Sequence, residues 1–310
     1  FNTREVLRRW LDTLQREAGG VDYETIVVDC ASRDGSADMV AEAFPTVRLI
    51  RSEENLGFAG ANNLGAREAR GRYLVLLNSD ALLRSDALPR ARAHMDASPS
   101  AGLGGARLIG EDGAWQPSAR MFPSALNDLL VLSGLAGVYP QSRFFGRVDR
   151  TWAEPGAAAS VDWVPGAFQI IRRELFEELG GFDERFFLYY EEVDLCRRIK
   201  AAGYEVWYWP DVEVVHLGGE SAKAVDGEAM TDSGKQLALW RLRSRFLYYR
   251  KHHGAFGAWR AKHIERVWHQ LRAWKNSGTP KAQESRALIA LIDQAWHDTQ
   301  RGTVSPQRPW

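Results

Sequence analysis

Residues 72–80 read RYLVLLNSD, and this stretch decides the class of fold that the sequence predicts. The apolar or aromatic run Tyr73 to Leu77 is followed at once by Asn78, Ser79 and Asp80. An unbroken apolar run of this length is typical of a buried parallel strand. In open α/β sheets ligands bind just beyond the carboxyl ends of such strands, where Asp80 could hold a divalent metal and the metal a diphosphate. A turn or the cap of the following helix would also explain Asp80.

Strand and helix patterns alternate on both sides of this stretch. Strands are expected at residues 24–29, 47–51 and 101–109, and helices at residues 36–44 and 85–97. Such alternation predicts an α/β fold in which a mostly parallel sheet is flanked by helices.

The chain begins in a helical pattern and not in a strand. Thr3 is the expected N-cap of this first helix. Its apolar residues recur at helical spacing: Val6, Leu7, Trp10, Leu11 and Leu14. A sheet of this type needs one more strand, because unpaired backbone groups at its centre would be costly. We therefore expect a native chain that begins before Phe1.

Three acids stand at the start of a later helical pattern. Glu191, Glu192 and Asp194 follow the aromatic-rich stretch FDERFFLYY at residues 182–190. The helix dipole favours carboxylates at this end, which would explain one of the three. Burial beside aromatic rings would raise the pKa of a carboxyl toward the range of a general base. The three acids therefore indicate the wall of a site.

His216 closes a pattern that predicts a hairpin. Residues 204–209 and 212–216 are expected as its strands, with Pro210 and Asp211 in the turn. A lone His at a strand end commonly has a structural role. The glycine-rich residues that follow leave room for a metal or a phosphate.

Charge and cysteine content narrow the classes of protein. The 310 residues include 40 basic and 40 acidic side chains, so net charge gives no support to nucleic-acid binding. Cys30 and Cys196 are interpreted as reduced thiols of a cytoplasmic protein. No apolar run approaches the roughly 20 residues of a membrane-spanning helix, and no signal peptide is visible.

Residues 235–275 interleave aromatic and basic side chains. Trp and Tyr favour membrane interfaces, and Lys and Arg favour anionic headgroups. The pattern predicts attachment to an anionic membrane surface, through residues that include Trp240, Phe246, Tyr248, Tyr249, Trp259, Trp268, Trp274, Arg241, Arg243, Arg245, Arg250, Lys251, Arg260 and Lys262. Two helices that pack their aromatics into the core would give the same pattern. A nucleic-acid patch ranks below both.

Four motifs occur in order along the chain: ENLGFAGANNLG at residues 54–65, LLNSD at 76–80, GGFDERFFLYYEEVDLCRR at 180–198 and HLGGES at 216–221. Together they resemble the inverting glycosyltransferases of family 2, which have the GT-A fold, and most closely the rhamnosyltransferase-like branch. The resemblance covers roughly residues 1–222. It implies a GT-A domain over residues 1–222. Residues 223–310 remain as a C-terminal helical region, and the membrane attachment predicted above belongs to this region.

The resemblance also implies a nucleotide-sugar donor site. Phe1 would pack on the base and Asp29 would hydrogen-bond to it. Asn55 and Asn62 would line the pocket, although Asn62 stands where relatives often have Arg. Asn78 takes the place of the first acid of the DXD motif and would contact the donor.

The remaining implied roles belong to the metal and to catalysis. Asp80 would bind Mg²⁺ or Mn²⁺, and His216 would complete the metal shell. Glu192 would be the catalytic base, with Glu191 as its partner in the motif and Asp194 as a further candidate acid. Inversion would need no covalent intermediate.

The resemblance implies transfer of a sugar to a saccharide or a polyprenyl-linked saccharide acceptor. Its branch favours dTDP-L-rhamnose as donor, with UDP-sugars left open. The irregular residues 112–160 are interpreted as an insertion or an acceptor-facing segment. These implied substrates would fit a cytoplasmic enzyme that is attached peripherally to the inner face of the cell membrane. Two alternatives remain: a sugar-nucleotide pyrophosphorylase, whose N-terminal signature is absent, and a non-catalytic sugar-nucleotide- or membrane-binding module.

Overall fold

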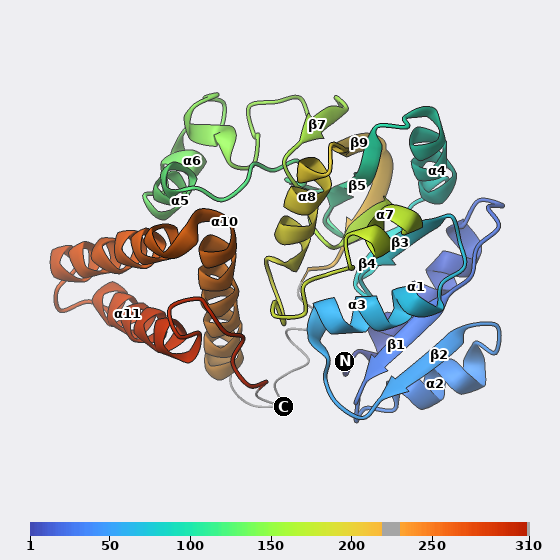
Figure 1. Ribbon diagram of the computed structural model, residues 1–310, viewed down its shortest axis with the longest axis horizontal. Helices are drawn as coiled ribbons and strands as arrows, with labels where there is room; N and C mark the ends of the chain where they lie inside the picture. Colours follow the sequence, from blue (N-terminus) through green and yellow to red (C-terminus); the bar gives the residue numbers. More distant parts are fainter. Residues whose placement is uncertain (219–229, 309–310) are drawn as a thin grey trace.

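The computed structural model describes residues 1–218 and 230–308. Figure 1 shows a sheet covered by helices beside a long helical hairpin from the C-terminal residues. The helices are α1 (Arg4–Glu17), α2 (Ser36–Ala43), α3 (Gly57–Glu68), α4 (Ala87–Ala97), α5 (Ala125–Leu132), α6 (Leu135–Val138), α7 (Arg173–Glu178), α8 (Glu191–Ala201), α10 (Met230–Lys275) and α11 (Pro280–Asp298), with a 3-10 turn at Phe145–Arg147. The strands are β1 (Ile26–Cys30), β2 (Arg48–Ser52), β3 (Tyr73–Leu77), β4 (Ala81–Leu83), β5 (Ala101–Ile109), β6 (Trp115–Gln116), β7 (Ala159–Val161), β8 (Phe168–Arg172) and β9 (Glu205–His216).

The α/β prediction is confirmed, but the larger sheet is mixed and not mostly parallel. Its strands lie in the order β3-β8-β5-β9-β4, with β6 beside β5 and β7 beside β9. In the described part of this sheet β5 and β9 are parallel, and the other pairs are antiparallel. The reason lies in β8, which returns antiparallel between β3 and β5 and is buried along nearly its whole length. An apolar run in the sequence therefore indicates that a strand is buried on both faces, but it does not indicate whether the strand pairs parallel or antiparallel.

β1 and β2 pair in parallel as a separate two-stranded sheet. Within the described residues no strand pairing joins this sheet to β3. The strand expected before Phe1 therefore stays a prediction.

The first predicted helix is α1, which buries its apolar side in the core through Leu7, Trp10, Leu11 and Leu14. Thr3 is the N-cap residue of α1 as expected, although its side chain makes no capping hydrogen bond.

The predicted hairpin at residues 204–216 is wrong, because β9 is one continuous strand. Its pairing with β5 jumps from Ala106–Trp209 to Arg107–Glu213, so residues 210–212 form a bulge. Pro210 has no N–H to donate to the ladder, and bulges tolerate such a residue. The bulge lets β9 continue to His216.

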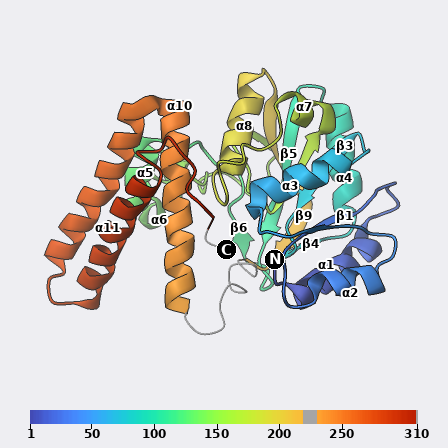
Figure 2. The ribbon, with the colours of Figure 1, turned by 60° about the horizontal axis from the view of Figure 1, so that its bottom comes forward.

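α10 consists of two segments that meet at Gly254, whose φ of 68° interrupts the helix. Figure 2 shows the first segment standing between the α/β part and α11. Trp240, Phe246, Tyr248 and Tyr249 on this segment are buried in the core. The membrane prediction is therefore wrong for these four aromatics, and the alternative of packed helices describes the first segment.

The second segment of α10 behaves differently. Trp259 is 48% exposed and Trp274 is 80% exposed. Basic residues named for membrane attachment pair with carboxylates in both segments: in the first, Arg243 with Asp298, Arg245 with Asp128 and Lys251 with Asp194, and in the second, Lys262 with Asp293. Among the residues that the structure describes, no helix is long and apolar enough to cross a membrane.

Two further predictions concern cysteines and domains. Cys30 and Cys196 are both buried and form no disulfide. The predicted boundary between residues 222 and 223 lies outside the described residues, as do Gly219, Glu220 and Ser221 of the last motif.

Candidate active site

Asp80 and His216 are brought together by the pairing of β4 with β9. In this register Ala81 lies opposite His216, so the residue before β4 faces the end of β9. His216 Nε2 lies 3.8 Å from Asp80 Oδ1, and Asp80 is only 5% exposed. The end of the strand predicted at residues 72–80 and the predicted metal-binding His therefore meet at one edge of the sheet.

Gln116 fixes the orientation of His216. Gln116 Nε2 donates to the main-chain oxygen of His216 at 3.0 Å, which leaves Oε1 as the acceptor, 2.9 Å from His216 Nδ1. Because an amide oxygen only accepts, Nδ1 carries a proton, and the tautomer with Nε2 free of a proton would present a lone pair toward Asp80. Sequence reasoning missed Gln116, whose spacing from the motifs gave no signal.

The donor atoms at this edge fit a divalent cation. A lone pair of His216 and a carboxylate of Asp80 face the same space, and a cation between them would relieve their repulsion. Within residues 1–218 and 230–308 no group of three or more His, Cys, Asp or Glu side chains could hold a metal. Among the described residues Asp80 and His216 would be two ligands, and such a pair would suit a cation that completes its shell with phosphate and water.

Glu191 and Glu192 begin α8 as two adjacent acids, of which Glu191 is buried and Glu192 is partly exposed. Each has a buried Oε2 that makes no hydrogen bond within the part of the chain that the structure describes. Burial raises the pKa of the Glu191 carboxyl well above its usual range, and the charge of Glu192 raises it further. Burial also raises the pKa of Glu192, although main-chain hydrogen bonds and the charge of Arg120 oppose the shift. An uncommitted buried carboxyl with a raised pKa suits a general base.

The backbone that leads into α8 is strained. Tyr189 and Tyr190 have φ values of 68° and 69°, in a region that residues with a side chain seldom adopt. The first segment of α10 supports this stretch: Ser244 Oγ donates to Leu188 O at 2.8 Å, and the rings of Tyr190 and Tyr248 are 5.4 Å apart. The buried aromatics of α10 thus help to hold the acids in place.

Asp194 differs from the two glutamates. It is fully buried, and its oxygens lie 2.8 Å from Arg198 Nε and 2.7 Å from His252 Nε2. Burial acts to raise the pKa of Asp194, but the hydrogen bond from His252 and the charges of Arg198 and Lys251 outweigh it and lower the pKa. These contacts tie α8 to α10 and leave the carboxylate no free oxygen.

Hydrogen bonds connect Asp29, at the end of β1, to the residue after Phe1. Asp29 Oδ2 accepts from Ser32 N at 3.1 Å, and Ser32 Oγ accepts from Asn2 N at 2.9 Å. Asn2 Oδ1 also accepts from Arg33 N at 2.8 Å, which fastens the first residues to the loop after β1. Ser32 was not predicted as a part of this site.

The loop before α3 packs against the segment that leads to the glutamates. Asn55 Oδ1 accepts from Gly57 N at 3.0 Å. Gly57 has a φ of 70°, and a Cβ there would lie 2.2 Å from Phe187 O, so this position requires glycine. Phe58 N also donates to Phe187 O, at 2.9 Å.

The two neighbouring asparagines of α3 have different environments. Asn62 Nδ2 donates to Phe58 O of its own helix at 2.9 Å. Asn63 is buried and bridges to Phe182 through both its amide nitrogen and its amide oxygen. Sequence reasoning named Asn62 and missed Asn63, which joins α3 to the 182–190 segment.

Comparison with known proteins identifies the family. Residues 1–180 match a model of the family described as glycosyl transferase family 2. This chain belongs to glycosyl transferase family 2.

Two curated relatives are rhamnosyltransferases. N-acetylglucosaminyl-diphospho-decaprenol L-rhamnosyltransferase of Mycobacterium tuberculosis is 30% identical over 206 residues, which are 62% of this chain and 65% of the relative. The dTDP-rhamnosyl transferase RfbF of Shigella flexneri is 24% identical over 247 residues, which are 78% of this chain and 76% of the relative. This family 2 chain therefore spans just under two thirds of the length of the mycobacterial protein.

Solved structures show that the fold is GT-A. A mannosyltransferase, PcManGT from Pyrobaculum calidifontis in complex with GDP-Man and Mn²⁺, has a TM-score of 0.53 at 19% identity and covers 97% of this chain and 84% of its own. GalNAc-T7 with UDP, GalNAc and Mn²⁺ has a TM-score of 0.56 at 14% identity, over 99% of this chain and 57% of its own.

For this family 2 chain the geometry separates the predicted site residues into groups. Asp80 and His216 face each other, while Glu191 and Glu192 form the acid pair at the start of α8. Asn78 shapes the turn before β4, because its main-chain oxygen accepts from Ala81 N at 3.0 Å.

Proposed function

We propose that this family 2 chain is a metal-dependent inverting glycosyltransferase. It transfers L-rhamnose from dTDP-L-rhamnose to a saccharide acceptor on a polyprenyl carrier, in the synthesis of a cell-surface polysaccharide. The observation that carries the proposal is the pair Glu191 and Glu192, each with a buried oxygen that has no hydrogen-bond partner among the described residues. Rhamnose and the lipid carrier are supported by the mycobacterial and Shigella relatives.

Glu192 is the base in this proposal. Its carboxylate removes the proton from the acceptor hydroxyl as that oxygen forms a bond to the anomeric carbon of the donor. The bond from the anomeric carbon to the diphosphate breaks, and its electron pair leaves with the nucleoside diphosphate. Attack opposite the leaving group inverts the anomeric centre, and the proton remains on Glu192 until the site opens to water.

Asp80 and His216 would hold Mg²⁺ or Mn²⁺. The bound cation supplies charge that stabilises the leaving diphosphate. Gln116 keeps His216 in the tautomer that can bind a metal. Phe1 and Asp29 would hold the base of the nucleotide, and Asn55 and Asn78 would line the pocket around the sugar diphosphate.

We also propose that the second segment of α10 rests on an anionic membrane. Its exposed apolar residues lie on one helix face and form what we call the α10 stripe: Phe256, Trp259, Val267, Leu271 and Trp274. Phe256 stacks on Trp259 with ring centroids 5.7 Å apart, and Trp259 stacks on His263 at 4.2 Å. An aromatic stripe of this kind suits the interfacial region of a bilayer, on the inner face where nucleotide sugars are found.

A donor panel tests the proposal. The protein is incubated with dTDP-L-rhamnose, UDP-glucose, UDP-galactose or GDP-mannose, with Mg²⁺, with Mn²⁺ or with EDTA, and released nucleoside diphosphate is measured. A diphosphate-linked N-acetylglucosamine on a short polyprenol serves as acceptor, and the coupling constants of the product report its anomeric configuration. Release from dTDP-L-rhamnose that requires metal, with an inverted product, is the expected result. Release from UDP-hexoses alone would change the donor assignment.

The remaining alternative is a non-catalytic module of the same fold. Nucleotide binding without turnover in the presence of every donor and metal would favour it. The pyrophosphorylase alternative is not retained, because the chain belongs to family 2.

A further inference from the structure

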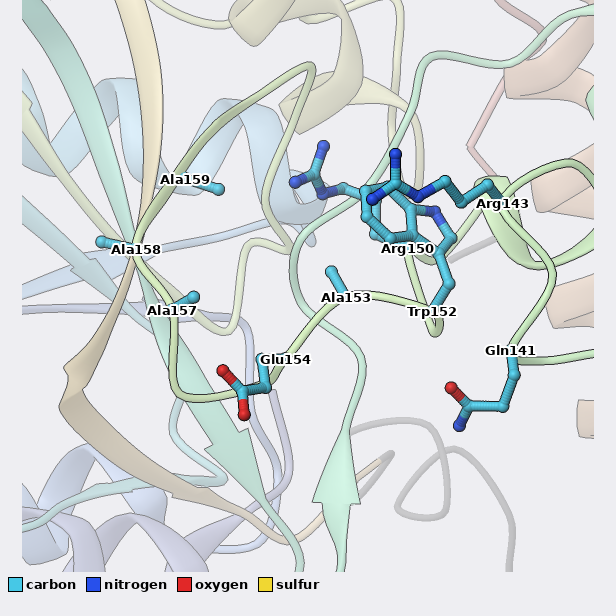
Figure 3. Close-up of a pocket in the computed structure, with 9 residues that line it drawn as sticks. All are labelled: Gln141, Arg143, Arg150, Trp152, Ala153, Glu154, Ala157, Ala158 and Ala159. Carbon is cyan, nitrogen blue, oxygen red and sulfur yellow. The ribbon is translucent and has the colours of Figure 1, made fainter.

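A pocket outside the proposed donor and metal site lies within the residues predicted to face the acceptor. It has a volume of about 400 Å³ and is lined by residues between 141 and 159. Figure 3 shows Arg143, Arg150 and Trp152 grouped on one side, with Glu154 and Gln141 on the other. We call it the arginine pocket. Its volume is in the range of sites that hold small ligands.

Two positive charges meet on one indole ring in this pocket. The guanidinium carbon of Arg143 lies 4.9 Å from the ring centroid of Trp152, and that of Arg150 lies 5.3 Å from the same centroid. Neither guanidinium pairs with a carboxylate of the described chain, and Arg150 Nε is buried without a hydrogen-bond partner. Neighbouring like charges repel, and an anion between them would be stabilised by both.

An exposed apolar surface adjoins the arginine pocket along the chain. Its residues come from α5, α6 and the following turn and form the α5–α6 strip: Leu126, Leu129, Val131, Leu135, Val138, Tyr139 and Phe144. Val138 is 65% exposed, and Phe144 directly follows Arg143. Phe144 and Tyr139 both contact the ring of Phe145, with centroids 5.2 Å away in each case. Arg143 and Phe144 thus connect the cationic pocket and the apolar strip along the chain.

The same segment is connected to the candidate base. Asp149, the residue before Arg150, pairs with Arg120 at 3.3 Å. The charge of Arg120 acts on the Glu192 carboxyl, and its guanidinium lies over the ring of Trp163 at 5.1 Å. Arg120 thus interacts both with a neighbour of the pocket residue Arg150 and with the candidate base.

We propose that the arginine pocket binds the diphosphate that joins the acceptor saccharide to its lipid, and that the α5–α6 strip contacts the lipid chain. The inference rests on the proposed function and adds the means by which the acceptor is recognised. An amphiphile with two phosphates matches a surface that has two unpaired guanidinium groups beside exposed apolar side chains. Arg143 and Arg150 donate to phosphate oxygens, and Trp152 keeps both guanidinium planes in position.

Glu154 sets a limit on the ligand. Its carboxylate lines the pocket away from the guanidinium groups and would repel a phosphate placed there. The diphosphate must therefore lie on the arginine side. Replacement of Glu154 by Gln should strengthen anion binding, whereas replacement of either arginine should weaken it.

Direct binding is measured first, by calorimetry in saturating dTDP and Mg²⁺ so that the donor site is already filled. Farnesyl diphosphate, inorganic pyrophosphate and farnesol are the probes. Farnesyl diphosphate is expected to bind most tightly, with an affinity about tenfold or more lower in Arg143→Gln/Arg150→Gln and higher in Glu154→Gln. Arg67→Gln, an exposed position on α3, is the matched control and should not change binding. Equal binding to the wild type and the double arginine variant would overturn the proposal.

A further double variant tests whether the α5–α6 strip contacts the lipid chain. Val138→Ser/Phe144→Ser should weaken binding of farnesyl diphosphate and leave pyrophosphate unchanged. If pyrophosphate binds as tightly as farnesyl diphosphate and these substitutions change neither, the lipid part of the proposal is wrong.

Kinetics separate this proposal from the proposed function. In the double arginine variant the KM for a lipid-diphosphate acceptor should rise about tenfold or more, while donor hydrolysis and transfer to a phosphate-free acceptor stay at the wild-type rate. Unchanged KM values would refute the arginine pocket and leave the glycosyltransferase assignment intact. An absence of donor turnover in the wild type would instead refute the proposed function.

Discussion

His252 Nε2 on α10 lies 2.7 Å from Oδ1 of Asp194 on α8, the helix that begins at Glu191. Lys251 Nζ lies 2.6 Å from the same oxygen, and Arg198 contacts the other one at 2.8 Å. A single buried carboxylate therefore joins the C-terminal helices to the helix of the candidate base. The C-terminal region is part of the support of the site.

Asp194→Asn is expected to destabilise the fold by about 3 kcal/mol, because it leaves partly buried cations without their carboxylate. The pKa of Asp194 is lowered in the folded chain, so its contribution is present above the ordinary pKa of Asp and is lost as the pH falls below it. Urea unfolding at neutral and acidic pH measures both effects. Asp38→Asn, which breaks an exposed pair with Arg51, is the control and should cost less than about 1 kcal/mol. Equal losses in the two variants would contradict the network.

Glu192→Gln is expected to lower the rate of transfer by about 10²-fold or more, the usual effect of removing a positioned base. Binding of dTDP-L-rhamnose should be unchanged, since the amide keeps the shape of the side chain. Steady-state rates and a donor titration give the two quantities. If Glu192→Gln is active and folded Asp194→Asn is inactive, the base has been assigned to the wrong acid.

The pH dependence of transfer follows from the raised pKa of Glu192. The base must be ionised, so kcat/KM should rise with pH and bend at a pH above the ordinary pKa of Glu. The charge of Arg120 lowers this pKa, so Arg120→Gln should move the bend to higher pH. A raised pKa also means that the folded state binds the proton more tightly, so stability falls as the pH rises from the ordinary pKa. A bend that stays in place in Arg120→Gln would show that another group titrates.

Asp80→Asn is expected to abolish metal-dependent turnover with the fold intact. Gln116→Leu frees the ring of His216 and should weaken Mn²⁺ binding about 10- to 100-fold, as expected for the partner of a metal-binding His. Electron paramagnetic resonance of Mn²⁺ in the presence of dTDP measures binding without reference to activity. Gln283→Leu, at an exposed position on α11, serves as the control. Wild-type Mn²⁺ affinity in Gln116→Leu would remove Gln116 from the site.

Motif residues at strand ends could be predicted because sheet geometry gathers such ends. Asp80 follows β3, His216 ends β9, and the register of β4 with β9 brings the two together. Gln116 could not be predicted, because it reaches His216 from a two-residue strand that carries no motif. The antiparallel return of β8 was equally hidden, since an apolar run reports burial and not direction.

The aromatics of α10 show a second limit of sequence reasoning. Trp240 and Trp259 lie in the same basic and aromatic pattern, yet one is fully buried and the other is half exposed. Periodicity identifies a helix face but not what covers it. Here the difference arises from tertiary contacts, because Trp240 packs on Phe187 with ring centroids 4.6 Å apart, while Trp259 stacks only on neighbours in its own helix.

The α10 stripe leads to the last prediction, which concerns membrane attachment. The double variant Trp259→Ser/Trp274→Ser should co-sediment less with anionic liposomes, because it removes both exposed indole rings of the α10 stripe. Lys251 and Lys262 already pair with carboxylates, so fewer charges face the lipid and salt should weaken attachment only in part. Tyr23→Ser, which removes an exposed ring far from the stripe in the sequence, is the matched control and should bind liposomes like the wild type. Trp240→Ser would remove a buried ring from the core and destabilise the fold, so its binding to liposomes would not test the stripe. If the wild type does not sediment with anionic liposomes even at low salt, the stripe does not bind a membrane and α10 serves only to support the site.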